Sequence, residues 1–255
     1  MSPEVRYYTS FNQDFEETRN QDAKIPQNYK WIHHNLFYRL FAVILYILVL
    51  IMDFVYMKFV AHISVKNRRL LKNARKNGGY YLFSNHTILF GDVVNPFCVN
   101  FPTHPYIICS SSNLGIPVAG KMLPMAGAIP VPDNLHDMAK FDQTVATRLK
   151  QGKAIVTYPE GHLWPYYTKI RPFAPAAFHL PVKHQTPVYT ATTTYQKSRF
   201  HKKPKITIYI DGPFEIDSNL SKKQAQEKLH QDVQKTMSER AELSNYEYII
   251  YRKKS

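Results

Sequence analysis

Short apolar runs alternate with longer amphipathic patterns along the chain from Gly78 onward. Short runs bounded by Gly, Pro, Ser or Asn are typical of strands, whereas apolar residues spaced three or four positions apart indicate helices. The apolar positions between 138 and 149 follow the helical spacing and predict an amphipathic helix from about Leu135 to Lys150. Strands that alternate with helices predict an α/β fold, with a mostly parallel central sheet flanked by helices. The other expected elements are strands at Tyr80–Phe83, Tyr106–Cys109, Lys153–Tyr158, Val188–Thr194 and Ile206–Ile210, and helices at Gly91–Val99 and Ser221–Leu243.

One stretch is too apolar to fit this alternation. Leu36–Val60 reads LFYRLFAVILYILVLIMDFVYMKFV, with an uninterrupted apolar centre from Leu40 to Met52. As a helix that centre would be roughly 20 Å long, shorter than the about 30 Å core of a bilayer. Including the flanks places Asp53 in the membrane at a cost on the order of 3 kcal/mol. We expect a membrane-anchoring helix that either spans the bilayer at a tilt or lies in one leaflet, with a buried helix of a soluble core as the alternative.

A basic cluster follows this stretch directly. Positive side chains next to an apolar helix attract anionic headgroups, at about 1 kcal/mol for each residue near the surface. Because positive flanks stay inside, a spanning helix would place the following domain on the cytoplasmic side. The first residues are polar, of mixed charge and unlike a secretory signal. We therefore divide the chain into a weakly ordered arm (1–30), a membrane-anchoring segment (31–77) and an α/β domain (78–255). The cluster consists of Lys66, Arg68, Arg69, Lys72, Arg75 and Lys76.

Composition and charge narrow the possible partners. A chain of 255 residues that is 44% hydrophobic can bury a full core and fits one domain with appendages. Lys and Arg outnumber Asp and Glu by 33 to 19, a net charge of +14 that indicates nucleic acid, a membrane surface or anionic substrates. No nucleic-acid-binding motif accompanies the charge. The two cysteines, Cys98 and Cys109, lack a CxxC spacing, so we expect reduced thiols, no metal site and no cofactor.

The leading candidate for chemistry is the segment Tyr80–Asp92, which reads YYLFSNHTILFGD. An apolar run ends at Ser84 and delivers His86 to the mouth of a predicted sheet, with Asp92 six positions further on. In parallel sheets, sites lie beyond the carboxyl ends of the strands. A histidine there can take a proton from a hydroxyl if a carboxylate orients it. A surface loop that happens to hold a histidine is the alternative.

Three further motifs follow in order. GAIPVPD occupies Gly127–Asp133, TYPEGHLWP occupies Thr157–Pro165, and TPVYTA occupies Thr186–Ala191. Together with NHT…D in the first segment, they resemble the four sequence blocks of the glycerolipid acyltransferase family. That family includes the 1-acylglycerol-3-phosphate acyltransferases, which act on lysophosphatidic acid. The resemblance covers roughly residues 36–212.

The resemblance implies an O-acyltransferase. It would move a fatty acyl group from acyl-CoA or acyl carrier protein to the hydroxyl of a lysophospholipid, with 1-acylglycerol-3-phosphate as the first acceptor to consider. His86 would act as general base, worth about 10²–10⁴-fold in rate, and Asp92 would orient it. The chain has no GxSxG elbow, which weakens a hydrolase interpretation. The expected substrate-binding residues are Gly127, Ile129, Pro130, Glu160, Gly161, His162 and Pro187, together with Lys121 and Arg171.

The chain departs from the family pattern at three places. Five residues separate His86 from Asp92 where the family has four, and a longer turn at Gly91 would absorb the extra one. The second block ends in Pro132-Asp133 where a basic residue is usual, and the third continues with His162-Leu163 instead of Thr-Arg. Two cations that would meet an acceptor phosphate are thus missing. Either Lys121, Lys169 or Arg171 substitutes, or the acceptor is another lysolipid or an uncharged alcohol.

These departures support one competing class of function, a catalytically inactive protein of the same fold that binds lipid or a protein partner. The remaining polar motifs add little. His179 and His184 lack the HExxH pattern of a zinc site, and His33-His34 suits a membrane interface. A second basic run between two predicted strands is either a solvated loop or a contact for headgroups or an acidic acyl carrier. It consists of Lys197, Arg199, Lys202, Lys203 and Lys205.

Overall fold

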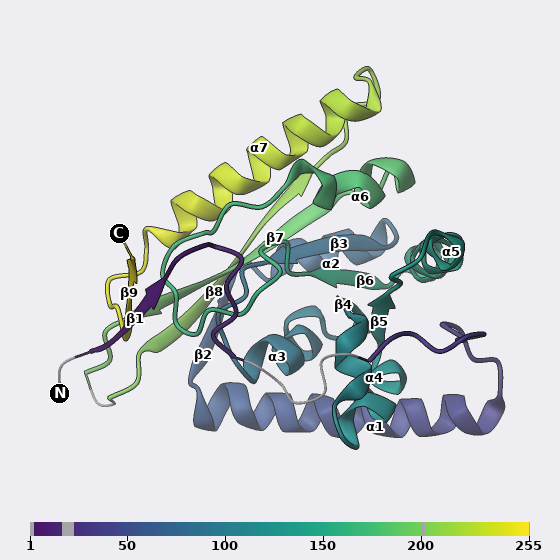
Figure 1. The fold of residues 1–255 in the computed structure, drawn as a ribbon, viewed down its shortest axis with the longest axis horizontal. Helices are drawn as coiled ribbons and strands as arrows, with labels where there is room; N and C mark the ends of the chain where they lie inside the picture. Colours follow the sequence, from purple (N-terminus) through teal and green to yellow (C-terminus); the bar gives the residue numbers. More distant parts are fainter. Residues whose placement is uncertain (1–2, 17–22, 200–201, 255) are drawn as a thin grey trace.

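The computed structural model describes residues 3–16, 23–199 and 202–254. Within this part the chain forms a seven-stranded sheet and a separate two-stranded one. The strands of the large sheet are β2 (Ile63–Lys66), β3 (Tyr80–Ser84), β4 (Pro105–Ser110), β5 (Ala128–Val131), β6 (Ala154–Thr157), β7 (Val188–Gln196) and β8 (Lys205–Phe214). Their order is β2-β8-β7-β3-β6-β4-β5, as Figure 1 shows, and every neighbouring pair is parallel except β7 with β8. This confirms the predicted α/β fold.

Helices cover both faces of the large sheet. They are α2 (Arg69–Lys76), α3 (Gly91–Asn100), α4 (Ala119–Ala126), α5 (Leu135–Lys150), α6 (His179–His184) and α7 (Lys222–Ala241). Because side chains alternate along a strand, Tyr81 and Phe83 of β3 pack among apolar residues of α5, α6 and α7. Tyr80 and Leu82 face the other way and pack with α2 and α3. All of β3 is therefore buried, which explains its unbroken apolar sequence.

The apolar segment forms helix α1 (Leu36–Val55), which continues as a π-helical turn through Val60. Asn35 begins the helix, since its side chain accepts a hydrogen bond from the Tyr38 N–H. Residues 36–60 are long and apolar enough to cross a membrane, and only 11% of their most apolar window is buried. This exposure excludes the interpretation of a buried core helix and makes α1 a candidate membrane anchor.

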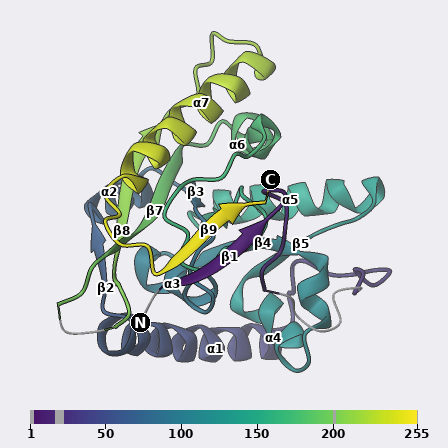
Figure 2. The ribbon, with the colours of Figure 1, turned by 60° about the vertical axis from the view of Figure 1, so that its left-hand side comes forward.

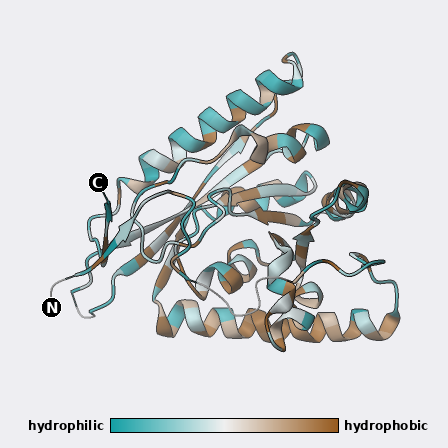
Figure 3. Ribbon diagram, viewed as in Figure 1, coloured by the Kyte–Doolittle hydropathy of each residue, from teal (hydrophilic) through white to brown (hydrophobic). Residues whose placement is uncertain are grey.

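Helix α1 lies along the α/β body, beneath α3 and α4 (Figures 1 and 3). Asp53, which would be costly in a membrane, is fully buried on the side that faces α3. Its Oδ2 accepts a hydrogen bond of 2.8 Å from the Cys98 N–H. The helix therefore presents a polar contact to the protein and an apolar surface, brown in Figure 3, to its surroundings.

The two ends of the chain form the small sheet. Strand β1 (Glu4–Tyr8) pairs in parallel with β9 (Ile249–Lys253), and Figure 2 shows them side by side. The predicted polar arm thus contains a strand in its described part. Strand β2, inside the predicted anchoring segment, forms an edge of the large sheet. The division into arm, anchor and domain stays a prediction.

His104 joins α1 to the start of β4. Its ring lies between those of Tyr46 and Tyr106, at centroid distances of 4.5 Å and 4.8 Å. Its Nδ1 donates a hydrogen bond of 2.8 Å to the Pro105 carbonyl. Burial lowers the pKa of His104 to about 4, and the positive charges of Lys153 and Arg148 add to this lowering. The ring is therefore neutral at neutral pH.

This pKa shift predicts a pH-dependent stability. Because the pKa in the folded chain lies below the ordinary 6.5, the unfolded chain binds more protons between pH 6.5 and 4. The contribution of His104 to the free energy of unfolding is at its maximum above pH 6.5 and falls by up to about 3 kcal/mol as the pH drops to 4. We expect His104→Gln to flatten this dependence in chemical denaturation series run in a neutral detergent. The exposed His136 is the matched control, since His136→Gln should leave the slope unchanged; an unchanged slope in His104→Gln would contradict the prediction.

Candidate active site

The loop after β3 is held by side chains that replace backbone pairing. Asn85 accepts a hydrogen bond from the Thr193 N–H (2.8 Å) and donates one to the Thr193 carbonyl (3.1 Å), so its amide extends the contact between β3 and β7. The next carbonyl, of His86, accepts from the Trp164 N–H, and that of Thr87 accepts from the Tyr195 hydroxyl. Residues 85–87 are therefore fixed on two sides.

His86 and Asp92 form the predicted contact. The His86 Nδ1 lies 2.8 Å from the Asp92 Oδ2, and this same oxygen accepts from the Ile88 N–H at 2.9 Å. Asp92 lies in the first turn of α3 and is 5% exposed, whereas the His86 side chain is 23% exposed. With Nδ1 facing the carboxylate, Nε2 is the nitrogen left for a substrate, and no described residue bonds to it.

The five-residue gap between these two residues is accommodated by a tight turn. The Asp92 N–H donates to the Ile88 carbonyl at 2.8 Å, and Gly91 lies between them. A Cβ at position 91 would stand 2.5 Å from the Ile88 Cγ2, closer than side chains tolerate. Glycine is thus required here by space, and the longer gap does not separate histidine from aspartate.

Tyr158, which the sequence interpretation passed over, supports both residues. Its ring stacks on His86 at a centroid distance of 4.5 Å. Its hydroxyl donates to the Asp92 carbonyl. That carbonyl would otherwise bond to the N–H four residues on, but position 96 is a proline and has none. Pro96 in the helix pattern, paired with a tyrosine at the end of β6, is the signal that could have identified it.

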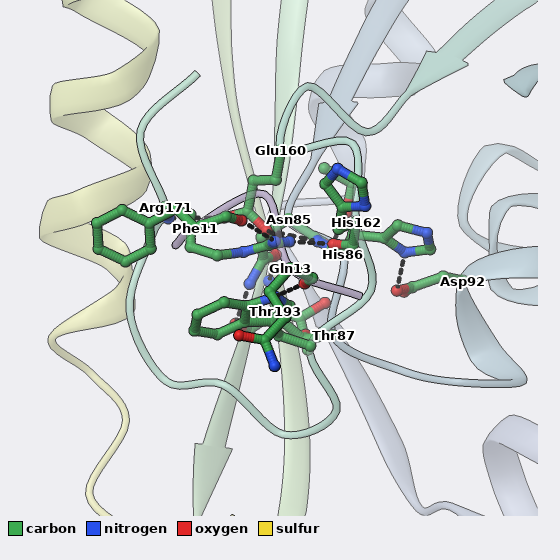
Figure 4. A network of polar contacts seen from close by, with 12 residues as sticks. Phe11, Gln13, Asn85, His86, Thr87, Asp92, Glu160, His162, Arg171 and Thr193 are labelled. Atoms are coloured by element: carbon green, nitrogen blue, oxygen red, sulfur yellow. Dashed lines mark hydrogen bonds and ion pairs between the residues drawn. The ribbon is translucent and has the colours of Figure 1, made fainter. Parts of the chain in front are cut away.

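Glu160 and Arg171 form an ion pair in which both side chains are fully buried. The Glu160 Oε2 accepts from the Arg171 Nη2 at 2.9 Å and from the His86 N–H at 3.1 Å. Its Oε1 accepts from the Arg171 N–H at 2.9 Å. Figure 4 shows these contacts beside the His86–Asp92 pair. The two residues face each other, and the substrate contacts predicted for them remain untested.

The rest of the third block lies under the N-terminal arm. Gly161 has a φ of +75°, which favours glycine, and a Cβ there would meet open space. His162 pairs with Asp14 of the arm through a 2.7 Å contact of its Nδ1. The buried Trp164 donates its indole N–H to the Gln13 carbonyl. A polar N-terminal sequence gave no signal that it would cover this loop.

The other predicted binding residues lie farther from His86. Ile129 and Pro130 belong to β5, three strands away from β3, or roughly 14 Å at the usual strand spacing. Gly127 precedes β5 and Pro187 precedes β7, so both lie at the amino ends of the parallel strands, whereas His86 lies beyond the carboxyl end of β3. Lys121 is exposed on α4. Their proposed contacts with a substrate stay predictions.

Metal ligation finds no support in the described residues, since these contain no group of three His, Cys, Asp or Glu side chains able to hold an ion. His184 instead shares a hydrogen bond with the Tyr81 hydroxyl, and its Nε2 lies 2.9 Å from Asp142. The His86–Asp92 contact described above suits proton transfer by an oriented imidazole.

Comparison with known proteins identifies the class. The family model described as acyltransferase matches residues 62–194, more than half of the chain, so the protein belongs to the acyltransferase family. The matched range contains His86, Asp92 and Glu160.

Among solved structures, the chain is similar to the 1-acyl-sn-glycerophosphate (LPA) acyltransferase PlsC from Thermotoga maritima. The identity is 17% and the TM-score 0.49, with 80% of this chain and 93% of that chain covered. The curated proteins contain no match to this sequence.

The buried ion pair leads to a prediction about stability. Glu160→Ala leaves the Arg171 charge buried without its partner, so we expect the free energy of unfolding to fall by about 3–5 kcal/mol. Urea denaturation measures this. Asp232→Ala, which removes an exposed ion pair with Lys228, is the control and should change stability by about 1 kcal/mol or less. Equal effects of the two substitutions would contradict the structural role of Glu160.

Proposed function

We propose that this acyltransferase moves a fatty acyl group from an acyl thioester, acyl-CoA or acyl carrier protein, to the hydroxyl of a lysophospholipid. The observation that carries the proposal is the 2.8 Å contact between His86 and Asp92 in a partly open loop at the end of β3. A carboxylate on Nδ1 holds the neutral imidazole with its lone pair on Nε2 and stabilises the protonated ring.

The transfer is direct. Nε2 of His86 takes the proton of the acceptor hydroxyl as the oxygen attacks the thioester carbonyl carbon. The tetrahedral intermediate collapses with cleavage of the carbon–sulfur bond, and the departing thiolate receives the proton from the imidazolium. An ester and a free thiol result, and His86 returns to its starting state. Glu160 positions the base, because its carboxylate binds the His86 N–H.

For the acceptor, 1-acylglycerol-3-phosphate is the first candidate, on the resemblance of the four sequence blocks. The two cations that the family pattern would supply are replaced, and Arg171 is already paired with Glu160. Another lysolipid or an uncharged alcohol is therefore the second candidate. A panel of lysolipids and alcohols with labelled acyl-CoA distinguishes them by which acceptor is consumed.

We propose further that α1 lies in one leaflet of the membrane. The helix packs along α3 and α4 and buries Asp53 against Cys98, so a spanning orientation would have to carry these contacts into the bilayer. The exposed apolar residues near the site, Leu89, Phe90 and Val93, would meet the same surface. The basic flank favours the cytoplasmic leaflet for this attachment, because the anionic lipids of that leaflet attract basic segments.

The role of His86 leads to a test. We expect His86→Ala to lower turnover by at least about 10²–10⁴-fold, because the acceptor hydroxyl loses its base. Asp92→Asn should also lower turnover strongly with little change in stability, since the amide can still accept from the Ile88 N–H. Labelled acyl transfer measures both, and His179→Ala at an exposed site is the control. Full activity of His86→Ala would refute the mechanism, and absence of turnover in the unmodified chain with every acceptor would support the lipid-binding alternative.

The role of α1 has its own test. Ile47 and Ile51 are 48% and 55% exposed on the apolar surface of the helix. The double substitution Ile47→Glu/Ile51→Glu should move the protein from the vesicle-bound to the soluble fraction, because a charge in the membrane costs on the order of 3 kcal/mol. Leu135→Glu/Met138→Glu, on α5, is the matched control and should leave vesicle binding unchanged. Equal binding of both variants would argue against α1 as the anchor.

A further inference from the structure

A cavity of about 660 Å³ lies at the amino ends of the strands of the large sheet, whereas His86 lies at their carboxyl ends. It is an open cleft lined by the residues before α1, the first half of α1, the end of α4, the amino ends of β4 and β5, and the end of α5. Because His86 follows the carboxyl end of β3, the length of the sheet separates this cavity from the acyl-transfer site. The mechanism above makes no use of it.

The walls of this cavity are positively charged. Arg39, Arg148 and Lys153 line it, and its lining contains neither Asp nor Glu. The positive charge acts on a neighbouring group. Burial is the main cause of the lowered pKa of His104, and the charges of Lys153 and Arg148 lower this pKa further. Charges of one sign that line a cleft create a field that favours an anion.

Two buried donors in this cavity lack partners among the described residues. They are the Arg148 Nε and the Tyr46 hydroxyl. The Arg148 guanidinium lies 4.5 Å from the centre of the Tyr106 ring and gives one hydrogen bond, from Nη1 to Gln151. A buried donor left without an acceptor is costly, on the order of 1–3 kcal/mol. Protein atoms cover both donors, so a ligand would reach them only after a shift of the Tyr46 or Arg148 side chain. Phosphate oxygens suit the planar guanidinium of an arginine.

The position of the cavity selects among phosphate ligands. Tyr38, Arg39, Val43 and Tyr46 of α1 form one side of it, and Val43 is 54% exposed on the apolar surface of that helix. A molecule with an anionic head and apolar tails fits both the cations of the cleft and this outer surface.

We propose that this cavity binds the phosphate headgroup of an anionic membrane phospholipid, with the acyl chains along the exposed face of α1. Arg148 and Lys153 would contact the phosphate, and Arg39 would lie at the entrance. The site is separate from acyl transfer and depends only on the proposed attachment of α1 to the membrane. It would hold the first half of α1 at a fixed depth beside the sheet.

The test is retention of lipid by the full chain in neutral detergent micelles that contain phosphatidylglycerol or phosphatidylcholine, measured by native mass spectrometry. We expect one retained phosphatidylglycerol for each chain. Arg148→Gln/Lys153→Gln should reduce retention about 10-fold or more, since each cation near a headgroup contributes substantially. Arg148→Lys should keep part of it. Ala42→Phe fills the cavity without changing its charge and should also reduce lipid retention. This variant tests the proposal if the double variant fails to fold.

Lys222→Gln/Lys223→Gln is the matched control, because it removes two charges from α7, on the other side of the sheet (Figure 1). It should keep the lipid, as should His86→Ala, which separates this result from acyl transfer. Undiminished retention in both cavity variants would overturn the proposal, as would equal retention of phosphatidylcholine. Displacement of the lipid by inorganic phosphate would overturn the assignment to a lipid in favour of a soluble anion.

Discussion

The buried ion pair of Glu160 and Arg171 joins segments that are far apart in the sequence. The Glu160 carboxylate binds the backbone of the histidine loop and the backbone and guanidinium of Arg171. Arg171 in turn donates to the carbonyls of His162 and Phe11. Three segments distant in sequence, the arm, the loop after β3 and the loop after β6, thus depend on one ion pair. The buried carboxylate is stabilised by the Arg171 guanidinium and by two backbone N–H groups.

Much of the fold follows from local sequence patterns. The apolar run at β3 and the helical spacing of α5 predicted these elements within a residue or two, since burial on one or two faces leaves a periodic signature. Strand β2 was not predicted, because it is short and lies at the edge of the sheet, where none of its side chains is fully buried. The pairing of β1 with β9 connects the two chain ends, and no local pattern can indicate such a partner.

The sequence predicted the contact between two motif residues of the candidate site, but it did not predict the contacts that depend on how distant segments pack. The spacing of His86 and Asp92 suggested their contact, and the structure adds why the unusual gap is possible, through Gly91. Glu160 and Arg171 were chosen as substrate contacts because each is charged and near the third block. Their mutual burial depends on the course of residues 160–171, which composition does not determine. Tyr158 and Asn85 act through backbone groups of other segments, a role that sequence alone rarely reveals.

The small sheet has a consequence for how the molecule is assembled. Residues 4–8 pair with residues 249–253, so strand β1 has no partner until residues 249–253 have been synthesised. The aromatic cover over Trp164 is attached to that strand, through Tyr8, Phe11 and Phe15. Contacts of such long sequence separation form late, because closing so large a loop costs entropy before it is rewarded. The third block is therefore enclosed only after residues 249–253 have been made, so the cover on Trp164 depends on strand β9.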